Sequence, residues 1–419
     1  MMPATFCEKS SKTPHKRIIA LVSDSRCSHG IYSPIMDAIK KSDKLDYFYI
    51  AGGMHLSDEY GRTIDIIKEE GYHVDAVMDI SDKEYKECLN DKNNECKSKN
   101  ISPLGIQAES IGKMIINLTE IFLKNKIDII LAQGDRGVTI ASAIAGAHLN
   151  IPVAHLHGGE VSGTIDESTR HAVTKYSHIH FPATKKSAER IEKLGEHRSR
   201  IFLVGASGVE YIKNRKLVEK EALFKEYGLD INKNTAVLLQ HPVSWEVEDS
   251  RKQIKETLSA LEESEVEQII IIYPNSDAGS TAIIEELKEF KSKTGKNAVI
   301  KKSIPFIEYL SLLKHSSMLI GNSSGSIIEA PSLGLPVINI GTRQTGREKA
   351  INIIDADYKK EEINKAINKT LNDASFLSAV KKCESPYDPF GDGRISERIV
   401  RVLENIKINK DLLNKVITY

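Results

Sequence analysis

Short apolar runs alternate with amphipathic stretches along most of the chain. In the first part, apolar runs typical of buried strands are followed by segments whose apolar residues recur with helical spacing. Such alternation predicts a parallel sheet with helices on both faces. We expect strands at 17–23, 45–51, 127–132 and 151–155, and helices at about 32–41, 58–70, 104–124 and 136–149.

The same pattern restarts after residues 204–208, with strands near 236–239, 268–273, 298–301, 318–320 and 336–340. The predicted fold class is therefore α/β, with two doubly wound Rossmann-like domains. We expect a first domain over residues 1–205, a second over 206–395 and a C-terminal helix over 396–419. The ligand is expected in the cleft between the domains. Residues 81–102, which are rich in Lys, Glu and Asn, predict a surface loop.

Composition narrows the possible partners and locations. The chain has 419 residues, which is too long for one hydrophobic core. Lys plus Arg and Asp plus Glu number 58 each, so the net charge favours neither nucleic acid nor an anionic membrane as a partner. We find no apolar run near 18 residues and no apolar signal-peptide core in residues 1–17. The five cysteines are scattered without metal-site spacing, which predicts a reducing, cytoplasmic location and no metal.

Titratable residues concentrate in residues 152–171, directly after a predicted strand. This segment holds three histidines, three carboxylates and Arg170 around a Gly-Gly pair. Because open α/β sheets bind ligands at the carboxyl ends of their strands, this density favours proton-transfer chemistry. Asp166 is equally compatible with a helix N-cap. His155 and His171 are expected to have structural roles.

Further polar clusters follow other predicted strands, at 23–30, 133–137, 239–243 and 320–326. In the last of these, Ser323 and Ser324 open a predicted helix. Backbone N–H groups and hydroxyls at such a helix start bind phosphate, although serines there also serve as simple caps. Arg343 and Arg347 add two guanidiniums able to bind phosphate oxygens.

Ordered motifs over roughly residues 17–395 resemble those of the hydrolysing UDP-N-acetylglucosamine 2-epimerases. They are Gly-Asp-Arg at 134–136, His-Leu-His-Gly-Gly-Glu-Val-Ser-Gly-Thr-Ile-Asp at 155–166, Gln-His-Pro-Val at 240–243, Pro-Asn-Ser-Asp-Ala-Gly-Ser at 274–280, Gly-Asn-Ser-Ser at 321–324 and Gly-Thr-Arg-Gln-Thr-Gly-Arg-Glu at 341–348. The resemblance implies an architecture like that of the B-type glycosyltransferases, with UDP held mainly by the second domain.

The same resemblance implies an activity. UDP is eliminated across C1 and C2 of UDP-N-acetylglucosamine, and water adds to the resulting 2-acetamidoglucal to release N-acetylmannosamine for sialic acid biosynthesis. It implies no cofactor and a homodimer or a dimer of dimers.

Site residues carry over by position. The resemblance implies acid/base roles for Asp135, Glu160 and Asp166. His157 stands where other members carry a Glu, so either its imidazole replaces that carboxylate or the role passes to Glu160. The residues implied to bind the UDP-sugar are Arg26, Arg136, His241, Asn275, Asp277, Ser303, Ser323, Ser324, Glu329 and Arg343.

Two motifs have competing interpretations. Ser303 with residues 304–306 fits either a wall beside the uracil or the start of a helix. Asp355 and Asp357 have the spacing of a metal-binding Asp-x-Asp pair, but Lys359 and Lys360 follow them, so we predict a helix start and no metal.

The main alternative substrate is UDP-N,N'-diacetylbacillosamine, because the sequence does not distinguish the substituents at C4 and C5. A glycosyltransferase and a non-catalytic nucleotide-sugar-binding protein would share the same two-domain cleft. The carboxylates at 135, 160 and 166 favour the hydrolysing epimerase over both.

Overall fold

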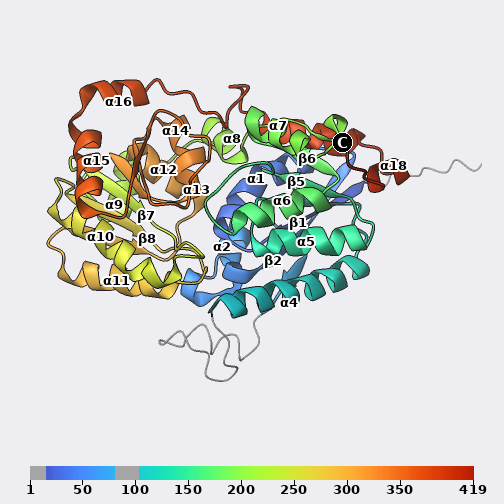
Figure 1. Cartoon of the computed structure of the whole chain (residues 1–419), viewed down its shortest axis with the longest axis horizontal. Helices are drawn as coiled ribbons and strands as arrows, with labels where there is room; N and C mark the ends of the chain where they lie inside the picture. The colour runs from blue at the N-terminus through green and yellow to red at the C-terminus, as the bar shows by residue number, and fades with distance from the viewer. Residues whose placement is uncertain (1–15, 81–102) are drawn as a thin grey trace, which may run out of the picture.

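The computed structural model describes residues 16–80 and 103–419, which contain two six-stranded parallel sheets (Figure 1). The first sheet has the order β3-β2-β1-β4-β5-β6 and the second the order β9-β8-β7-β10-β11-β12, so both follow the same doubly wound path. The predicted α/β class with two Rossmann-like domains is confirmed. The loop expected at 81–102 lies outside the described residues. Within residues 16–80 and 103–419, no helix has the length and apolar character needed to cross a membrane.

The strands agree with the apolar pattern except for three short ones that it did not predict: β3, β6 and β12. Those of the first sheet are β1 (Arg17–Ser23), β2 (Leu45–Gly52), β3 (Ala76–Met78), β4 (Ile129–Gln133), β5 (Val153–Leu156) and β6 (Ile179–Phe181). Those of the second are β7 (Thr235–Leu239), β8 (Gln268–Ile272), β9 (Asn297–Lys301), β10 (Met318–Gly321), β11 (Val337–Ile340) and β12 (Ile353–Ala356).

Helices cover both faces of each sheet (Figure 1). Around the first sheet lie α1 (Arg26–Lys40), α2 (Ile64–Glu69), α4 (Pro103–Lys124), α5 (Gly137–His148), α6 (Asp166–Tyr176) and α7 (Lys185–Lys193), followed along the chain by α8 (Ser207–Asn214) and α9 (Lys220–Glu226). The later helices are α10 (Ser250–Glu263), α11 (Ser280–Lys293), α12 (Phe306–His315), α13 (Ser324–Ile328), α14 (Ala330–Leu333), α15 (Lys360–Asn372), α16 (Ala374–Val380), α17 (Ile395–Asn405) and α18 (Lys410–Leu413).

The helix expected at 58–70 is interrupted. A short 3-10 turn at Asp58–Tyr60 ends at Gly61, and α2 begins only at Ile64. Gly61 and Arg62 have φ angles of +87° and +44°. Because a right-handed helix requires negative φ, the chain cannot continue as one helix through these two residues.

The interpretation of Asp355 as part of a helix start is wrong. Asp355 lies in β12, while α15 begins at Lys360. Its carboxylate accepts hydrogen bonds from Asn339 Nδ2 at 2.7 Å and Lys349 Nζ at 2.6 Å. The strand register decides this placement, because Asp355 is the partner of Asn339 on β11.

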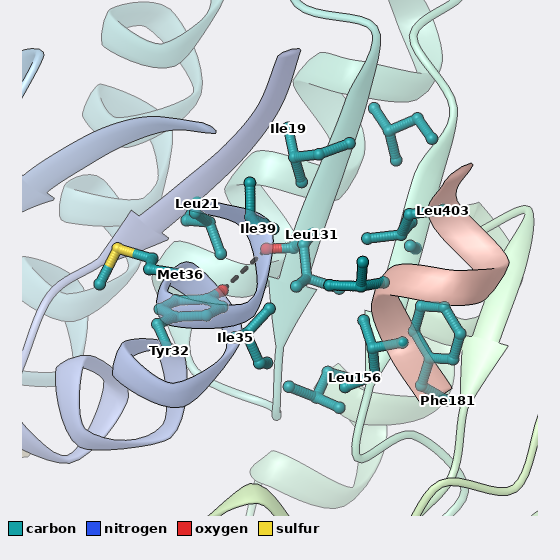
Figure 2. Packing of buried hydrophobic residues seen from close by; sticks show 14 of the residues in the cluster. Ile19, Leu21, Tyr32, Ile35, Met36, Ile39, Leu131, Leu156, Phe181 and Leu403 are labelled. Carbon is teal, nitrogen blue, oxygen red and sulfur yellow. Dashed lines mark hydrogen bonds between the residues drawn. The ribbon is translucent and has the colours of Figure 1, made fainter. Parts of the chain in front are cut away.

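The C-terminal helix α17 packs on the first half of the molecule, not on the second sheet that precedes it. Leu403 is fully buried in the same cluster as Ile19, Leu131 and Phe181 (Figure 2). In that cluster the Tyr32 hydroxyl donates a hydrogen bond to the Leu131 carbonyl at 2.8 Å (Figure 2). The core of the first half is therefore completed by the end of the chain.

The chain passes between the two halves twice, at neighbouring places. Near the first passage Gly205 has a φ of +94° and lies against Ile395 and the Tyr387 carbonyl. Ala206 N donates to Tyr387 O at 2.9 Å, which joins the two passages directly. The expected domain ranges of 1–205, 206–395 and 396–419 stay a prediction.

Candidate active site

The carboxyl ends of the two sheets face each other across a cleft that contains a cavity of about 170 Å³, here called the main cavity. Most of the predicted ligand-binding residues line it, and they come from both halves of the chain. These are Arg26, Asp135, Arg136, Asp166, His241, Asn275, Ser303, Ser323, Ser324, Glu329 and Arg343.

A smaller space of about 70 Å³, here called the side chamber, adjoins the main cavity. Seven residues line both spaces: Cys27, Gln133, Asp135, Asp166, Ser324, Glu329 and Arg343. The walls found only in the side chamber include His157, Glu160, Gln344, Arg347, Ile31 and Ile328. Of the predicted site residues, His157 and Glu160 line only the side chamber, while three carboxyl groups, one hydroxyl and one guanidinium line both spaces.

Asp135 reaches the junction of the two spaces from the end of β4. Gly134 precedes it with a φ of +74°, a conformation that glycine adopts without strain, and this turns the chain out of the sheet. Arg170, whose side chain is 1% exposed, forms an ion pair with Asp135 and a second one of 3.0 Å with Glu167. Burial acts to raise the pKa of Asp135, but Arg170 and two further guanidiniums outweigh it and lower this pKa.

Arg170 is a functional residue whose role the sequence analysis did not assign. Its guanidinium also donates to Ser162 Oγ and to the Glu160 carbonyl, both at 3.1 Å. One buried side chain therefore fixes the loop after β5 to the carboxylate after β4. The sequence does contain one indication of this role. Arg170 comes three residues after Glu167 on a predicted helix, so the two side chains share one helix face.

Asp166 does not cap its helix, so that interpretation is wrong. It is the first residue of α6, the N-cap position belongs to Ile165, and no side chain makes a capping hydrogen bond. The carboxylate instead faces the cavity, with its Oδ2 atom 3.7 Å from Nη2 of Arg343. Burial and the nearby Asp135 raise the pKa of Asp166. Two neighbouring carboxylates are thus shifted in opposite directions, which is the usual arrangement of an acid and a base.

His157 is held in an unusual backbone conformation at the wall of the side chamber. Its φ of +62° lies in the left-handed region, which costs a non-glycine residue about 1 kcal/mol. Its backbone N–H donates to the Phe181 carbonyl at 3.0 Å. Burial lowers the pKa of the imidazole, so His157 is neutral at pH 7.

Glu160 and Arg347 form an ion pair between the two halves of the molecule. Glu160 Oε2 lies 3.1 Å from Arg347 Nη2, and the side chains are only 4% and 6% exposed. Nearby, Gly163 N donates to the Arg343 carbonyl at 3.0 Å. A Cβ atom at Gly163 would overlap the Thr342 carbonyl, so glycine is required at this contact. Arg347, which the sequence placed with the phosphate-binding groups, is instead committed to Glu160.

The two histidines with expected structural roles have them. His155 is fully buried, and its Nε2 atom lies 2.8 Å from the Gly134 carbonyl. His171 Nε2 lies 2.9 Å from Glu167 Oε1. Both contacts support the residues that surround Asp135.

The opposite side of the main cavity is formed by the loops after β7, β8, β10 and β11. Ser323 caps α13, since its hydroxyl accepts from Gly325 N at 3.3 Å, and it still lines the cavity. Arg343 Nη1 donates to the Asn322 carbonyl at 3.1 Å. His241 Nδ1 accepts from Asn275 N at 3.0 Å, and burial lowers the pKa of this imidazole well below its usual range.

Two further cations of the first half reach the main cavity. Arg26 Nη1 donates to Ser303 Oγ at 3.0 Å, across the cleft. Arg136 Nε donates to Asp24 Oδ2 at 2.9 Å, and its Nη2 atom lies 3.9 Å from Asp277. Asp277 itself lines a neighbouring cavity with Arg136. Ser303 precedes α12, which begins at Phe306, so the segment does start a helix; both residues also line the main cavity, and the wall beside the uracil stays a prediction.

Glu329 lies at the end of α13 between the two spaces. Its side chain is buried, and burial raises the pKa of the carboxyl to about 7. Gly208 packs directly against it, because a Cβ atom there would overlap a Glu329 oxygen. Taken together, cationic and hydroxyl groups from both halves line the main cavity, and the carboxylates Asp135 and Asp166 lie where it meets the side chamber. The site can bind an anion and transfer protons beside it.

Comparison with known proteins agrees with this arrangement. The family model described as UDP-N-acetylglucosamine 2-epimerase matches residues 37–404. A protein of Legionella pneumophila named UDP-N,N'-diacetylbacillosamine 2-epimerase (hydrolyzing) is 34% identical over 405 residues, covering 96% of this chain and 100% of its own. A UDP-N-acetylglucosamine 2-epimerase of Neisseria meningitidis serogroup B is 31% identical, with coverages of 93% and 95%.

Solved structures have the same architecture. The crystal structure of UDP-GlcNAc 2-epimerase from Neisseria meningitidis bound to UDP-GlcNAc superposes with a TM-score of 0.72 at 17% identity, covering 92% of this chain and 99% of that one. At this identity the likeness concerns the fold, which is the B-type glycosyltransferase-like architecture that the sequence predicted. Because the family model spans most of the chain, this protein belongs to the UDP-N-acetylglucosamine 2-epimerase family.

Proposed function

We propose that this protein is a hydrolysing epimerase that converts a UDP-2-acetamido sugar and water into UDP and the free C2-epimeric sugar. The observation that carries the proposal is the pair of carboxylates Asp135 and Asp166 at the junction of the two spaces, with pKa values shifted in opposite directions. A lowered pKa keeps Asp135 ionised as a proton acceptor. A raised pKa makes Asp166 a better proton donor at neutral pH.

In the proposed reaction, Asp135 removes the C2 proton while the bond between C1 and the diphosphate oxygen breaks. The electron pair of the C–H bond forms the C1–C2 double bond, and UDP leaves with the pair of the C–O bond. Water then adds to C1 and loses one proton to solvent, while Asp166 returns a proton to the opposite face of C2. Proton exchange with solvent afterwards removes the proton from Asp135 and restores the one on Asp166. His157 is the proposed partner in these transfers, since its neutral imidazole lines the side chamber together with both carboxylates.

Glu160 is proposed to act through charge. Its ion pair with Arg347 favours an electrostatic role over proton transfer. The diphosphate is proposed to bind Ser323, Ser324 and Arg343, with Arg26, Arg136 and His241 completing the cationic and hydrogen-bonding wall. Asn275, Asp277, Ser303 and Glu329 are proposed to contact the nucleoside.

The sequence resemblance favours UDP-N-acetylglucosamine as the substrate and N-acetylmannosamine as the product. A second candidate, UDP-N,N'-diacetylbacillosamine, is supported by the full-length match to the Legionella protein of that name. A role in sialic acid biosynthesis, a homo-oligomeric state and a cytoplasmic location are proposed on the same basis as the first candidate.

The test follows each UDP-sugar by NMR in deuterated water with EDTA present. We expect UDP and a free amino sugar with deuterium at C2, because the proton removed is not the one returned. UDP-N-acetylmannosamine as the main product, or a strict need for a divalent metal, would contradict the proposal. The faster of the two UDP-sugars identifies the substrate.

A further inference from the structure

Residues 410–419, here called the C-terminal tail, bind to the first half of the molecule. Arg200, which follows α7, donates to the carbonyls of Asp411 and Leu412, both at 2.6 Å. Further along the tail, Lys415 turns inward, since its side chain is only 14% exposed. The tail therefore places one largely buried cation against the first half.

The Lys415 ammonium lies at the carboxyl end of α6. Its Nζ atom donates to the carbonyls of Thr174 at 3.1 Å and Ser177 at 2.8 Å, and to the Glu196 carboxylate at 2.9 Å. An ammonium has three N–H groups, so all of its donors are used. A cation here also interacts favourably with the partial negative charge at the carboxyl end of a helix. Lys415 therefore fixes the end of α6 that lies opposite to Asp166.

The contact between Lys415 and Glu196 does not by itself explain why the tail buries a charge. Burial lowers the pKa of the Lys415 ammonium to about 8, although Glu196 acts in the opposite direction. The fully buried Glu196 side chain already pairs with Lys175 at 2.7 Å. What Lys415 adds beyond this pair is the two hydrogen bonds to the carbonyls of α6.

The amino end of α6 carries two groups of the candidate active site. Asp166 is the first residue of the helix and lines both spaces of the cleft. Arg170, one turn further along, forms the ion pair with Asp135. Because a hydrogen-bonded helix moves largely as one rigid element, a displacement at its carboxyl end also moves these groups. The position of α6 thus sets the spacing of the two carboxylates.

A second connection runs from the same helix to Asp135. Thr174, whose carbonyl binds Lys415, has its Oγ1 atom 3.2 Å from His155 Nδ1, and His155 Nε2 lies 2.8 Å from the Gly134 carbonyl. A carbonyl oxygen only accepts, so Nε2 carries the proton and Nδ1 is the acceptor that faces the Thr174 hydroxyl. Burial lowers the pKa of His155 to about 3, which keeps the ring neutral. Contiguous contacts therefore join Lys415 to the residue before Asp135.

We infer that Lys415 is a positioning residue for the proposed reaction, because it holds Asp135 and Asp166 in place through α6. The inference rests on the proposed roles of these two carboxylates. Lys415 itself lines neither space of the cleft. The tail thus contributes to turnover without touching the substrate.

The first test is Lys415→Met, which keeps the length of the side chain and removes its three donors. A misplacement of about 1 Å can cost about 10²-fold in rate, so we expect kcat to fall about 10-fold. Calorimetry with UDP counts the intact binding sites, and kcat is expressed per site. The UDP dissociation constant should change less than about 2-fold. Lys410→Met, at an exposed lysine of the same tail, is the matched control and should keep the kcat of the parent.

A role of Lys415 in stability alone gives a different result. It would lower the melting temperature and the number of UDP-binding sites, while kcat per site stayed unchanged. That outcome would overturn the inference, and so would an equal loss of kcat in Lys410→Met.

The second test measures hydrogen exchange of backbone amides by mass spectrometry. We expect Lys415→Met to increase exchange in peptides that cover residues 166–177 and 133–136, whereas Lys410→Met leaves both unchanged. Lys415→Gln, which retains an amide donor, replaces Lys415→Met in both tests if the methionine variant does not fold. Unchanged exchange in both segments would contradict the coupling between the tail and the site.

The two readouts separate this inference from the proposed function. If the parent protein releases no free amino sugar from either UDP-sugar, the proposed reaction is wrong. The exchange comparison still decides whether Lys415 holds α6 and the segment before Asp135.

Discussion

The first and second sheets have the same strand order, but the segments that follow their strands differ in charge. After β4 and β5 of the first sheet come Asp135, His157 and Glu160, held by Arg170 and Arg347. After β7 and β10 of the second come His241, which is hydrogen-bonded to Asn275 and Asn322, and Ser323, while Arg343 follows β11, so no carboxylate ends these three strands. Two sheets with the same strand order thus present different side chains to the cleft. The apolar pattern that forms the strands does not determine the residues that follow them.

The largest expected effect tests the first sheet alone. We expect Asp135→Asn and Asp166→Asn each to reduce turnover by at least about 10²-fold, the usual contribution of a proton-transfer group. UDP affinity should stay nearly constant, because UDP lacks the sugar that these groups face. The measurements are steady-state kinetics and calorimetry with UDP.

If UDP affinity falls in proportion to turnover, the carboxylates after the first sheet also contribute to UDP binding, and the two sheets do not have separate roles. For Asp135→Asn, the melting temperature serves as the control, since the change also weakens the ion pair with the buried Arg170. Glu160→Gln and His157→Asn in the same assay distinguish the charge role from the proton-transfer role.

The next effect tests the second sheet. Arg343→Ala should weaken UDP binding by about 2–3 kcal/mol, the range for losing a charge-assisted contact. A surface arginine would change it by no more than about 0.5 kcal/mol. Calorimetry with UDP measures the difference.

Arg343 Nη2 also lies 3.7 Å from Asp166 Oδ2, so removing the guanidinium changes the surroundings of this carboxylate as well as the proposed diphosphate site. The double variant Arg343→Ala with Asp166→Asn is the control. If Arg343 acts on the diphosphate, the loss of UDP affinity should be the same in the double variant as in Arg343→Ala alone.

The smallest expected effect is a change in stability with pH caused by Glu329, which lines both the main cavity and the side chamber. Its pKa of about 7 in the folded protein exceeds the ordinary value of 4.5, so the folded state binds more protons than the unfolded state between these limits. Stability should therefore fall as pH rises through this window, by about 1–1.5 kcal/mol between pH 5.5 and 7. Denaturant unfolding of the parent and of Glu329→Gln, which lacks this titration, measures it. Identical pH profiles would contradict the shifted pKa.

The fold was predictable because its signal is local. Runs such as residues 17–23 and 268–272 are apolar enough to fix both sheets, and the alternation with helices fixes their parallel character. The failures are short or mixed elements. β12 carries Asp355, which is satisfied by Asn339 and Lys349 of its surroundings, and no sequence pattern at residue 355 contains that information.

The site was predictable in its residue types and less so in its partners. Asp135, Glu160 and Asp166 do line the cleft as expected, but the ion-pair partners of Asp135 and Glu160, which are Arg170 and Arg347, lie 35 and 187 positions away in the sequence. The N-cap interpretation of Asp166 failed for a related reason. Spacing alone cannot show that the carboxylate turns toward Arg343.

The chain passes between the two halves at two places, and the hydrogen bond from Ala206 N to Tyr387 O joins these passages into one connection. A single linker would permit swivelling in any direction. Two adjacent linkers, with α17 anchored in the first core, connect the halves at two points in place of one. Any separation of the halves must also break the contacts beside these passages, where Gly163 meets Thr342 and Glu160 meets Arg347.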